Sequence, residues 1–395
     1  MKPTVFILDG EQRAALAATR SLGEKGINVL VGSSLPSSLA GSSRYAAGRI
    51  VYHDPSDAPH KFIEDIRQII HKNAVGILLP ITDISMYHVL KNAHEFSRAA
   101  LPFASFDQYV KASDKMELMR MAQDLGVPVP RTIHIHDRRD INGIPPEVTY
   151  PAVLKPRASL IDHDGTIIRT SVKIVRDEQE LINAVNTLAA FQNPFMIQEM
   201  VAGDGVGIFT LFHEGKPTAL FSHRRIREKP PWGGVSAVSD SSEVSSEIRD
   251  YAFRILGSMN WEGPAMVEFK WDDKRDVPVL MEINARFWGS LQLSIDAGVD
   301  FPYLLYLQAI GAYFEPVMSH RQTRLRWLLG DFDNLYITLK SPRERLPREY
   351  HDKYKVLCNF IKEFAGPARL EVLRKGDLKP FIWELRQYIK NVLAG

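Results

Sequence analysis

Cysteine is almost absent from the sequence, and so are long apolar runs. Cys358 is the only thiol among the 395 residues. A single cysteine excludes an intramolecular disulfide and a metal site built from clustered cysteines, and it is typical of proteins kept in a reducing compartment. No run of about 18 uncharged apolar residues occurs, so no transmembrane helix is predicted, and the apolar segment after Thr4 is too short for a signal-peptide core. We therefore expect a cytoplasmic protein.

The chain as a whole also lacks an excess of charge of one sign. Lys and Arg number 49 and Asp and Glu number 47, which gives a formal net charge of +2. The distribution is uneven, however, because residues 321–395 hold 16 basic and 9 acidic residues, whereas residues 1–320 hold 33 and 38. An acidic body without interleaved basic and aromatic residues argues against nucleic acid as a partner.

The first 108 residues alternate between apolar strands and amphipathic helices. Strands are predicted at Thr4–Leu8, Asn28–Val31 and Val75–Leu79, and helices at Arg13–Lys25 and Lys61–His71. Strands without polar alternation, separated by helices, indicate a parallel sheet that is covered on both faces. The first strand is not followed by a G-x-G-x-x-G fingerprint, so this Rossmann-like domain is not expected to serve a nicotinamide-dependent dehydrogenase.

The rest of the chain changes pattern twice. Residues 109–320 read as α+β, and residues 321–395 read as a basic, mainly helical extension. Strands are predicted at Thr132–His136, Ala152–Lys155, Val172–Val175, Phe195–Gln198, Gly207–Phe212, Thr218–Ser222, Met266–Trp271 and Val279–Ile283.

The end of the extension, Phe381–Val392, reads as an amphipathic helix. Its apolar side chains are Phe381, Ile382, Leu385, Ile389 and Val392. We expect this helix to dock onto the body of the protein or onto a second subunit. A basic helix lying on a membrane surface is the disfavoured alternative.

Two glutamates and an asparagine lie on two short strands that are joined by the polar segment 272–276. If these strands pair as a hairpin, Glu268 and Glu282 can face the same side, and Asn284 shares the parity of Glu282. Such oxygen ligands suit Mg²⁺, whose remaining positions phosphates and water can fill. Arg286 could stabilise charge on a transferring phosphoryl group without titrating. The alternative is a pair of surface glutamates on an amphipathic hairpin.

Two lysines form a second group of candidate residues. Lys115 opens a predicted helix behind Asp114, and Lys155 ends an apolar strand, where a lysine needs an anionic partner such as a polyphosphate. The connection 157–170 could close over phosphates through backbone N–H groups. A solvated Lys115 and an ordinary surface loop are the alternatives.

Two further segments could contact ligands. The turn Gln198–Asp204 follows a strand, and its backbone groups could recognise an adenine edge; a strand end with a polar turn is the alternative. The segment His223–Ser236 contains three arginines and a lysine within seven residues and then a Gly-Gly turn. This segment suits the capture of a carboxylate or phosphate, with nucleic-acid binding as the rival interpretation.

In order and spacing, these motifs resemble the ATP-grasp superfamily, in particular its members similar to the carbamoyl-phosphate synthase large chain and the carboxylate–amine ligases. The resemblance covers about residues 4–315 and implies a Rossmann-like pre-ATP-grasp domain followed by an ATP-grasp fold. The implied divisions are a domain at 1–108, an ATP-grasp domain at 109–320 with a small lobe at about 113–198 and a large lobe at about 199–320, and the extension at 321–395.

The resemblance also implies residue roles. The residues that correspond to ATP-binding positions are Lys115 and Lys155 for the phosphates, Glu199, Met200 and Val201 for the adenine, and Asp204 as the carboxylate nearest the ribose position, where spacing alone puts Val206. The metal ligands correspond to Glu268, Glu282 and Asn284, and the arginine that stabilises the transferring phosphoryl group corresponds to Arg286. The residues placed beside the carboxylate substrate are Arg224, Arg225, Gly234 and Ser236.

The implied activity is that of an ATP- and Mg²⁺-dependent ligase, with Mn²⁺ as an alternative metal. It would activate a small-molecule carboxylate as an acyl phosphate for attack by an amine. The alternatives are an enzyme that phosphorylates a carboxylate or makes a carbamoyl-phosphate-type product without forming an amide, and a non-catalytic ATP-binding sensor. No nucleic-acid partner is expected, and a homodimer is compatible with the sequence.

Overall fold

The chain folds into two compact units, each built from separate stretches of sequence. The computed structural model describes residues 2–137, 146–163 and 166–394. The first unit comprises residues 1–103, 217–243 and 286–395, and the second comprises residues 104–216 and 244–285. The domain boundaries predicted near residues 108 and 320 divide the chain by its resemblance to known folds and not by compactness. They stay a prediction.

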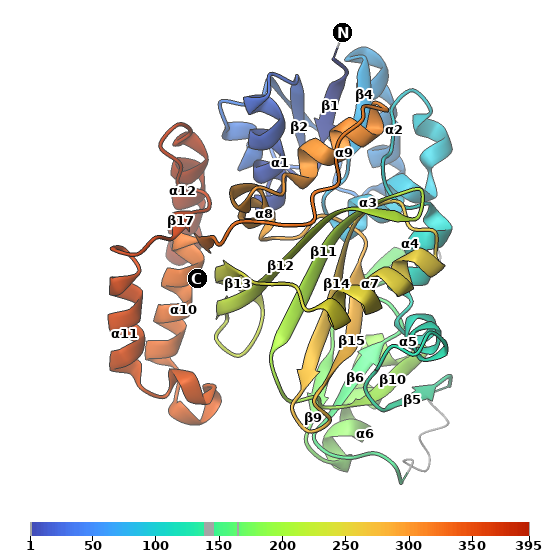
Figure 1. Ribbon diagram of the computed structural model, residues 1–395, viewed down its shortest axis with the longest axis vertical. Coiled ribbons are helices and arrows are strands. Elements are labelled where there is room, and N and C mark those ends of the chain that lie inside the picture. Colours follow the sequence, from blue (N-terminus) through green and yellow to red (C-terminus); the bar gives the residue numbers. More distant parts are fainter. Residues whose placement is uncertain (1, 138–145, 164–165, 395) are drawn as a thin grey trace. The chain divides into compact units, whose positions relative to one another are not determined.

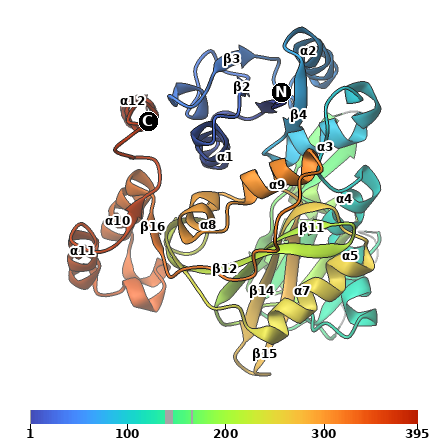
Figure 2. The same cartoon turned by 45° about the horizontal axis from the view of Figure 1, so that its top comes forward.

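The first unit begins with a four-stranded parallel sheet in the order β3-β2-β1-β4, which confirms the predicted Rossmann-like start (Figures 1 and 2). Its strands are β1 (Thr4–Ile7), β2 (Val29–Ser33), β3 (Gly48–Val51) and β4 (Val75–Leu79). Its helical segments are α1 (Arg13–Glu24), α2 (Pro59–Lys72), α3 (Asp83–Lys91) and the 3₁₀ turns η1 (Ala40–Ser42) and η2 (Ala93–Phe96). Val5 pairs with Val29 of β2 and with Ile77 of β4, so β1 is an inner strand.

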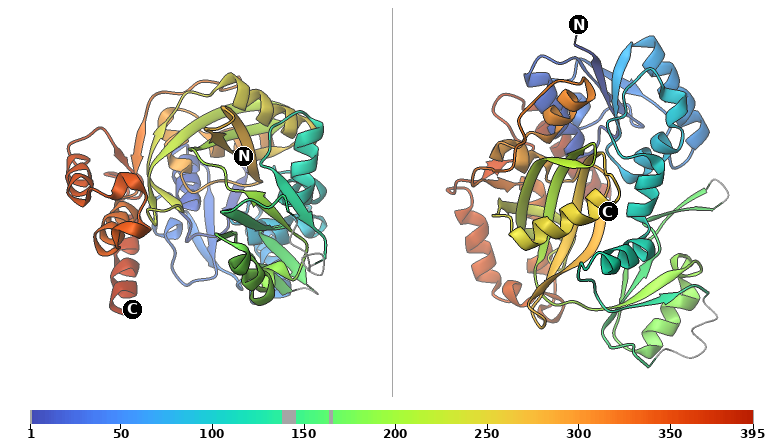
Figure 3. Two further views of the ribbon diagram at one scale, coloured as in Figure 1. Left: turned by 90° about the horizontal axis from the view of Figure 1, so that it is seen from below. Right: turned by 45° about the vertical axis from the view of Figure 1, so that its right-hand side comes forward.

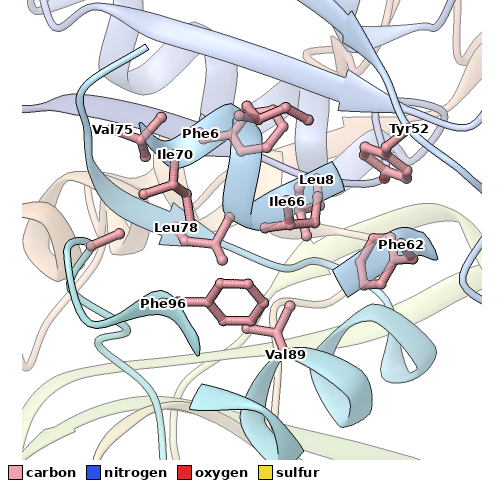
Figure 4. Close-up of a cluster of buried hydrophobic side chains, with 12 residues drawn as sticks. Phe6, Leu8, Tyr52, Phe62, Ile66, Ile70, Val75, Leu78, Val89 and Phe96 are labelled. Atoms are coloured by element: carbon pink, nitrogen blue, oxygen red, sulfur yellow. The ribbon is translucent and has the colours of Figure 1, made fainter. Parts of the chain in front are cut away.

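Apolar side chains of β1 and α2 form the core on one face of this sheet (Figure 4). Phe6 points to the same face as Leu8, because side chains alternate along a strand. On α2, Phe62 and Ile66 stand one helical turn apart and are fully buried against this cluster. Val89 of α3 also packs into the cluster. Burial of each such side chain contributes about 1.5–3 kcal/mol to the stability of the fold.

The edge strand β3 is absent from the sequence-based prediction. Gly48 and Arg49 replace the apolar run that marks the other three strands, and the side chains of β3 alternate between half-buried and exposed. An edge strand pairs on one side only, so it needs fewer apolar residues than an inner strand.

The remaining strands of the first unit lie in the order β12-β13-β16-β17. They are β12 (Lys216–Lys229), β13 (Val235–Ser241), β16 (Arg324–Arg326) and β17 (Arg369–Leu370). The helical segments that accompany them are α8 (Leu291–Ala297), α9 (Phe301–Ala309), α10 (Leu328–Lys340), η5 (Arg343–Arg345), η6 (Arg348–Tyr350), α11 (Lys353–Lys362) and α12 (Lys379–Ala394). The predicted helical C-terminal extension is therefore confirmed, and β16 and β17 are two short strands within it.

The second unit holds an antiparallel four-stranded sheet and a second group of three antiparallel strands. The first has the order β5-β10-β6-β9, with β5 (Thr132–Ile135), β6 (Ala152–Pro156), β9 (Lys173–Val175) and β10 (Phe195–Glu199). The second has the order β15-β14-β11, with β11 (Gly205–His213), β14 (Gly263–Asp272) and β15 (Val277–Asn284). Its helical segments are α4 (Phe106–Ser113), α5 (Lys115–Asp124), α6 (Glu178–Thr187), η4 (Ala189–Phe191) and α7 (Ser246–Ser258).

The connection 157–170, predicted as a loop over phosphates, contains a short hairpin. β7 (Leu160–His163) pairs antiparallel with β8 (Thr166–Arg169). Asp164 and Gly165, which join the two strands, lie outside the described residues. Whether this hairpin covers a ligand stays a prediction.

The last helix, α12, packs through a face that the sequence does not predict (Figures 1 and 3). Glu384 accepts a hydrogen bond from Trp327 Nε1 at 2.7 Å, and Tyr388 donates one to Asp333 Oδ1 at 2.5 Å. Most of the predicted docking stripe is exposed instead, namely Ile382, Leu385, Ile389 and Val392. The predicted docking of this helix onto the body of the protein is therefore confirmed, but hydrogen-bonding side chains rather than the apolar stripe make the contacts and fix the rotation of the helix.

In the part of the chain that the structure describes, no helix is both long and apolar enough to cross a membrane.

Candidate active site

The hairpin formed by β14 and β15 brings the two predicted metal-binding glutamates together. Glu268 lies directly opposite Glu282, and Met266 lies opposite Asn284. Residues that face each other across an antiparallel pair lie on the same side of the sheet. One face of the hairpin therefore carries two carboxylates and one amide, as the spacing of the sequence predicts.

The carboxylate of Glu282 is held by two neighbours. Lys115 Nζ lies 2.9 Å from Glu282 Oε2, and Asn284 Nδ2 donates to Glu282 Oε1 at 3.1 Å. Burial by itself would raise the pKa of Glu282, but the charge and hydrogen bond of Lys115, with Asn284, lower it to about 2. Glu282 is thus ionised at any physiological pH.

Lys115 reaches Glu282 because of how its helix begins. Asp114 caps α5, and its Oδ1 accepts from the backbone N–H groups of Met116 and Glu117. Its Oδ2 accepts from Arg157 Nε at 2.6 Å, so Asp114 also joins the start of α5 to the end of β6. The predicted helix start at Asp114 is confirmed, whereas no local pattern predicts the contact with Arg157.

Lys155 lies at the end of β6, opposite Met196 of β10. It is only 7% exposed, and no hydrogen bond or ion pair to its ammonium group occurs among the described residues. Burial, and then the nearby charge of Lys115, lower the pKa of Lys155 to about 8, against the opposing effect of Glu282 and Glu268. A buried ammonium group in this position fits an anion such as a phosphate.

The oxygen ligands on this face of the β14–β15 hairpin also fit a hard cation. Among the described residues, no group of three or more His, Cys, Asp or Glu side chains is placed to hold a metal ion. Glu268, Glu282 and Asn284 supply only oxygen ligands, with Glu282 held ionised. Mg²⁺ characteristically takes one or two protein carboxylates and completes its octahedron with phosphate oxygens and water.

The predicted adenine-binding turn follows β10. Glu199 at its start is bound by Arg131, whose Nε lies 2.8 Å away, and by Arg275, so the Glu199 carboxylate is already paired. Met200 is 47% exposed, whereas Val201 is buried and its carbonyl oxygen accepts from a lysine on β14. Only the backbone and the Met200 side chain of this turn are therefore available to an adenine.

The turn ends at Gly203 and Asp204. Gly203 has φ of +112°, and a Cβ at this position would lie 1.9 Å from the carbonyl oxygen of Trp271, so only glycine fits. Asp204 accepts a backbone hydrogen bond from Trp271 at 3.0 Å, while its side chain is exposed. Among the described residues, no hydrogen bond or ion pair engages the Asp204 carboxylate, and its role at the ribose stays a prediction.

Arg286 belongs to the first unit, where it is held in place. Its Nε donates to Asp83 Oδ1 at 2.8 Å, and its Nη1 donates to the carbonyl oxygen of Phe287 at 3.0 Å. Asp83 opens α3, and sequence reasoning missed it as a functional residue. The only sequence signal was the helix start at Thr82-Asp83, which does not indicate a partner two hundred residues away.

The predicted substrate segment forms the end of β12 and the start of β13 in the first unit. Arg224 Nη2 lies 3.4 Å from Asp240 and is largely exposed, and Arg225 Nη1 lies 2.9 Å from Glu228. Ser236 Oγ shares a 2.5 Å hydrogen bond with Ser239 Oγ. Arg224 therefore already has an acidic partner on the neighbouring strand β13, and Arg225 has one on its own strand β12.

Gly234 and the histidines of this region have structural explanations. A Cβ on Gly234 would lie 2.3 Å from the carbonyl oxygen of Lys229, so the turn requires glycine. His223 is buried, its Nε2 lies 2.8 Å from Ser290 Oγ, and burial lowers its pKa to about 3. His213 Nδ1, on β11 of the second unit, lies 2.9 Å from Glu262 Oε1.

Comparisons with known proteins agree with this architecture. A family model described as "ATP-grasp in the biosynthetic pathway with Ter operon" matches residues 191–329. The carbamoyl phosphate synthase large chain of Pyrococcus furiosus is 22% identical over 191 residues, which are 47% of this chain and 17% of that protein. The chain thus matches about a sixth of the length of this curated relative.

Solved structures extend the similarity beyond the matched segment. An L-amino acid ligase from Bacillus licheniformis has a TM-score of 0.61 and 17% identity, over 78% of this chain and 74% of that one. The ADP complex of N5-carboxyaminoimidazole synthetase from Staphylococcus aureus has a TM-score of 0.63 and 15% identity, over 82% of each chain. The chain therefore has the ATP-grasp fold, and the sequence-based identification of an ATP-grasp protein similar to carbamoyl-phosphate synthase and to carboxylate–amine ligases is confirmed. The relatives belong to the class of enzyme that the sequence predicts.

Proposed function

We propose that this protein is an ATP- and Mg²⁺-dependent ligase that activates a carboxylate as an acyl phosphate and joins it to an amine. The observation that supports the proposal is that Lys115, Lys155 and the ionised Glu282 lie close together in the second unit. Lys115 Nζ lies 2.9 Å from Glu282 Oε2, and the charges of both lysines act on the pKa of Glu282. Opposite charges at one place suit a metal–polyphosphate, which carries both signs.

Each of the candidate residues of the second unit would contact one part of the metal–nucleotide complex. Lys115 and Lys155 would bind phosphate oxygens, and Glu268, Glu282 and Asn284 would hold Mg²⁺. When bound, Mg²⁺ would neutralise charge on the phosphates. The backbone between Glu199 and Val201, with Met200, would contact the adenine, and Asp204 the ribose.

The reaction needs no nucleophile from the protein. A carboxylate oxygen of the substrate would attack the γ-phosphorus of ATP, and the bond from that phosphorus to the β–γ bridging oxygen would break, releasing ADP. The amine nitrogen would then attack the acyl carbon, lose a proton, and expel inorganic phosphate. Catalysis would therefore come from positioning and charge neutralisation.

The remaining roles rest on the resemblance to ATP-grasp enzymes. Arg286 would neutralise charge on the phosphoryl group, because a guanidinium stays protonated at every pH of interest. The carboxylate substrate would contact the segment that contains Arg224, Arg225, Gly234 and Ser236. Since Arg224 is the more exposed of the two arginines and lies 3.4 Å from its acidic partner, it is the better placed to exchange that partner for a substrate carboxylate.

The test is release of ADP in mixtures of carboxylates and amines, with the product identified by its mass. Lys155→Ala is expected to lower kcat/KM by about two orders of magnitude. The matched control is Lys173→Ala, an exposed lysine on the neighbouring strand β9 of the same sheet. Full activity in Lys155→Ala would contradict the assignment of the phosphate site.

A second pair of variants tests the metal site. Glu282→Gln keeps the shape of the side chain but removes its charge, and we expect the dependence on Mg²⁺ concentration to shift to higher concentrations together with a loss of turnover. Glu247→Gln, an exposed glutamate on α7, is the control. An acyl phosphate trapped by hydroxylamine without any need for an amine would contradict amide formation, and ATP binding without turnover in any mixture would contradict catalysis.

A further inference from the structure

The C-terminal segment, which is the extension at residues 321–395, exposes side chains of almost one sign of charge. Among its described residues, twelve Lys or Arg side chains are exposed but only three acidic ones, Glu344, Glu349 and Asp352. The other six acids turn inward, for example Asp331 to Arg326 and Glu371 to Arg13. The surface of the segment is thus more cationic than its composition suggests.

The same segment also exposes many apolar side chains. Of the 24 exposed large hydrophobic residues of the described chain, 12 lie from Phe332 onward. They are Phe332, Tyr336 and Leu339 on α10, Tyr354 and Ile361 on α11 with Phe364 just after it, Leu378 before α12, and Ile382, Leu385, Ile389, Val392 and Leu393 on α12. Exposed apolar groups gathered in one part of a protein mark a surface that contacts another phase or partner.

The stripe on α12 is held outward. Ile382, Leu385 and Ile389 recur at intervals of three and four residues, so they share one face of the helix. The opposite face is fixed by the hydrogen bonds Trp327–Glu384 and Tyr388–Asp333. Rotating the stripe inward would break both bonds.

Cations border this stripe. Lys379, Arg386 and Lys390 are exposed on α12, and its one acid, Glu384, points to Trp327. α10 contacts the inward face of α12, where Asp333 accepts from Tyr388 (Figure 3). An aliphatic stripe bordered by cations is the pattern of helices that lie in a membrane interface.

We propose that this surface, made of the α12 stripe with Arg386 and Lys390, binds the surface of an anionic lipid bilayer. The cations would meet anionic headgroups, and the aliphatic stripe would enter the boundary between headgroups and acyl chains. A second copy of this chain would oppose cations to cations, and a nucleic acid would leave the aliphatic stripe without a partner.

The experiment is co-sedimentation of the full chain with vesicles of phosphatidylcholine, with or without phosphatidylglycerol. We expect binding to the anionic vesicles only. Leu385→Glu and Ile389→Glu should each weaken it at least tenfold, because they place an anion in the inserted stripe. Arg386→Gln combined with Lys390→Gln should weaken it roughly thirtyfold, since each cation near an anionic bilayer contributes about fivefold.

The control variant is Leu188→Glu in the second unit, because Leu188 is 40% exposed and Leu385 is 37% exposed. It should bind vesicles as the unchanged chain does, and thermal unfolding of every variant should confirm that the fold is retained. Equal pelleting of Leu385→Glu and the unchanged chain would overturn the proposal. So would a dimer that Leu385→Glu dissociates, or RNA binding, if either occurs without any binding to anionic vesicles.

This proposal is independent of the proposed ligase activity. ADP release by the α12 variants in the absence of vesicles should equal that of the unchanged chain, so the failure of one proposal leaves the other intact.

Discussion

The guanidinium of Arg286 is held by the carboxylate of Asp83, with Nε 2.8 Å from Oδ1. The backbone before Asp83 is held in position, because the N–H groups of Ile81 and Thr82 donate to the buried carboxylate of Asp9 at 3.0 and 2.8 Å. Asp9, near the start of the chain, is thus linked to Arg286, the arginine of the proposed phosphoryl-transfer step. The link consists of the hydrogen bonds from the backbone before Asp83 to Asp9 and of the ion pair between Asp83 and Arg286.

From this contact we predict that Asp83→Asn lowers kcat by about tenfold with little change in the KM for ATP, because a loosened arginine would be misplaced only as charge develops. Asp83→Glu should restore part of the loss. The measurement is steady-state kinetics with Asp57→Asn, an exposed aspartate just before α2, as the control. A loss confined to KM, or an equal loss in the control, would contradict a positioning role.

The pH dependence of ATP binding should report Lys155. Its pKa is lowered to about 8, mainly by burial, and only the protonated form attracts phosphates. Below about pH 7 nearly all of Lys155 is charged, so the KM for ATP should be flat, and above pH 8 it should rise by up to about tenfold per pH unit. Lys155→Arg should abolish this rise. A KM that rises equally in Lys155→Arg would assign the ionisation to another group.

Glu384 should make the protein less stable as the pH rises. Burial raises its pKa from 4.5 to about 7, and Oε2 has no hydrogen-bond partner among the described residues. Between these values the folded state binds a proton that the unfolded state has lost, so the contribution to stability is complete below pH 4.5 and is lost as the pH approaches 7, by at most about 3 kcal/mol.

Glu384→Gln tests this sign, because glutamine can accept from Trp327 but does not titrate. The free energy of unfolding of the unchanged chain minus that of the variant should fall between pH 5 and pH 8. Taking the difference removes the opposite trend expected from His223, whose lowered pKa favours folding as the pH rises. A difference that is constant with pH would contradict a raised pKa for Glu384.

The buried ion cluster of the first unit should be a large contributor to stability. Asp331 is fully buried and accepts from Arg227 at 2.5 Å and from Arg326 at 2.7 Å. Asp331→Asn leaves two guanidinium groups with too little negative charge, and we expect a loss of about 3–5 kcal/mol in urea unfolding. Glu344→Gln, at an exposed site of the same segment, should change the free energy of unfolding by less than about 0.5 kcal/mol.

Local patterns predicted the parts of the site that lie on neighbouring strands. The β14–β15 hairpin follows from two apolar strands around a polar connection, and its parity alone places Glu268 and Glu282 on one face. Lys155 was recognisable because it ends an apolar strand. In each case the chemistry depends on residues whose spacing in the chain determines their spacing in the structure.

Partners distant in sequence could not be predicted in this way. Nothing near Arg286 signals Asp83, and nothing in α12 signals that Trp327 and Asp333 will decide which face points inward. The periodicity of α12 was interpreted correctly as amphipathic, but a period defines a stripe and not what lies against it. Tertiary hydrogen bonds, which periodicity does not encode, decided the orientation.

The first helix of the chain is completed by the last part of the chain. Arg20 of α1 binds Asp377 at 2.9 Å and donates to the carbonyl oxygens of Glu371 and Val372. A ribosome must therefore add more than 350 residues after Arg20 before the partners of this buried guanidinium exist. Closing so long a loop slows folding more than it weakens the native state. During synthesis α1 would carry this cation without its native partners, and the guanidinium could be buried only after residues 371–377 have been made.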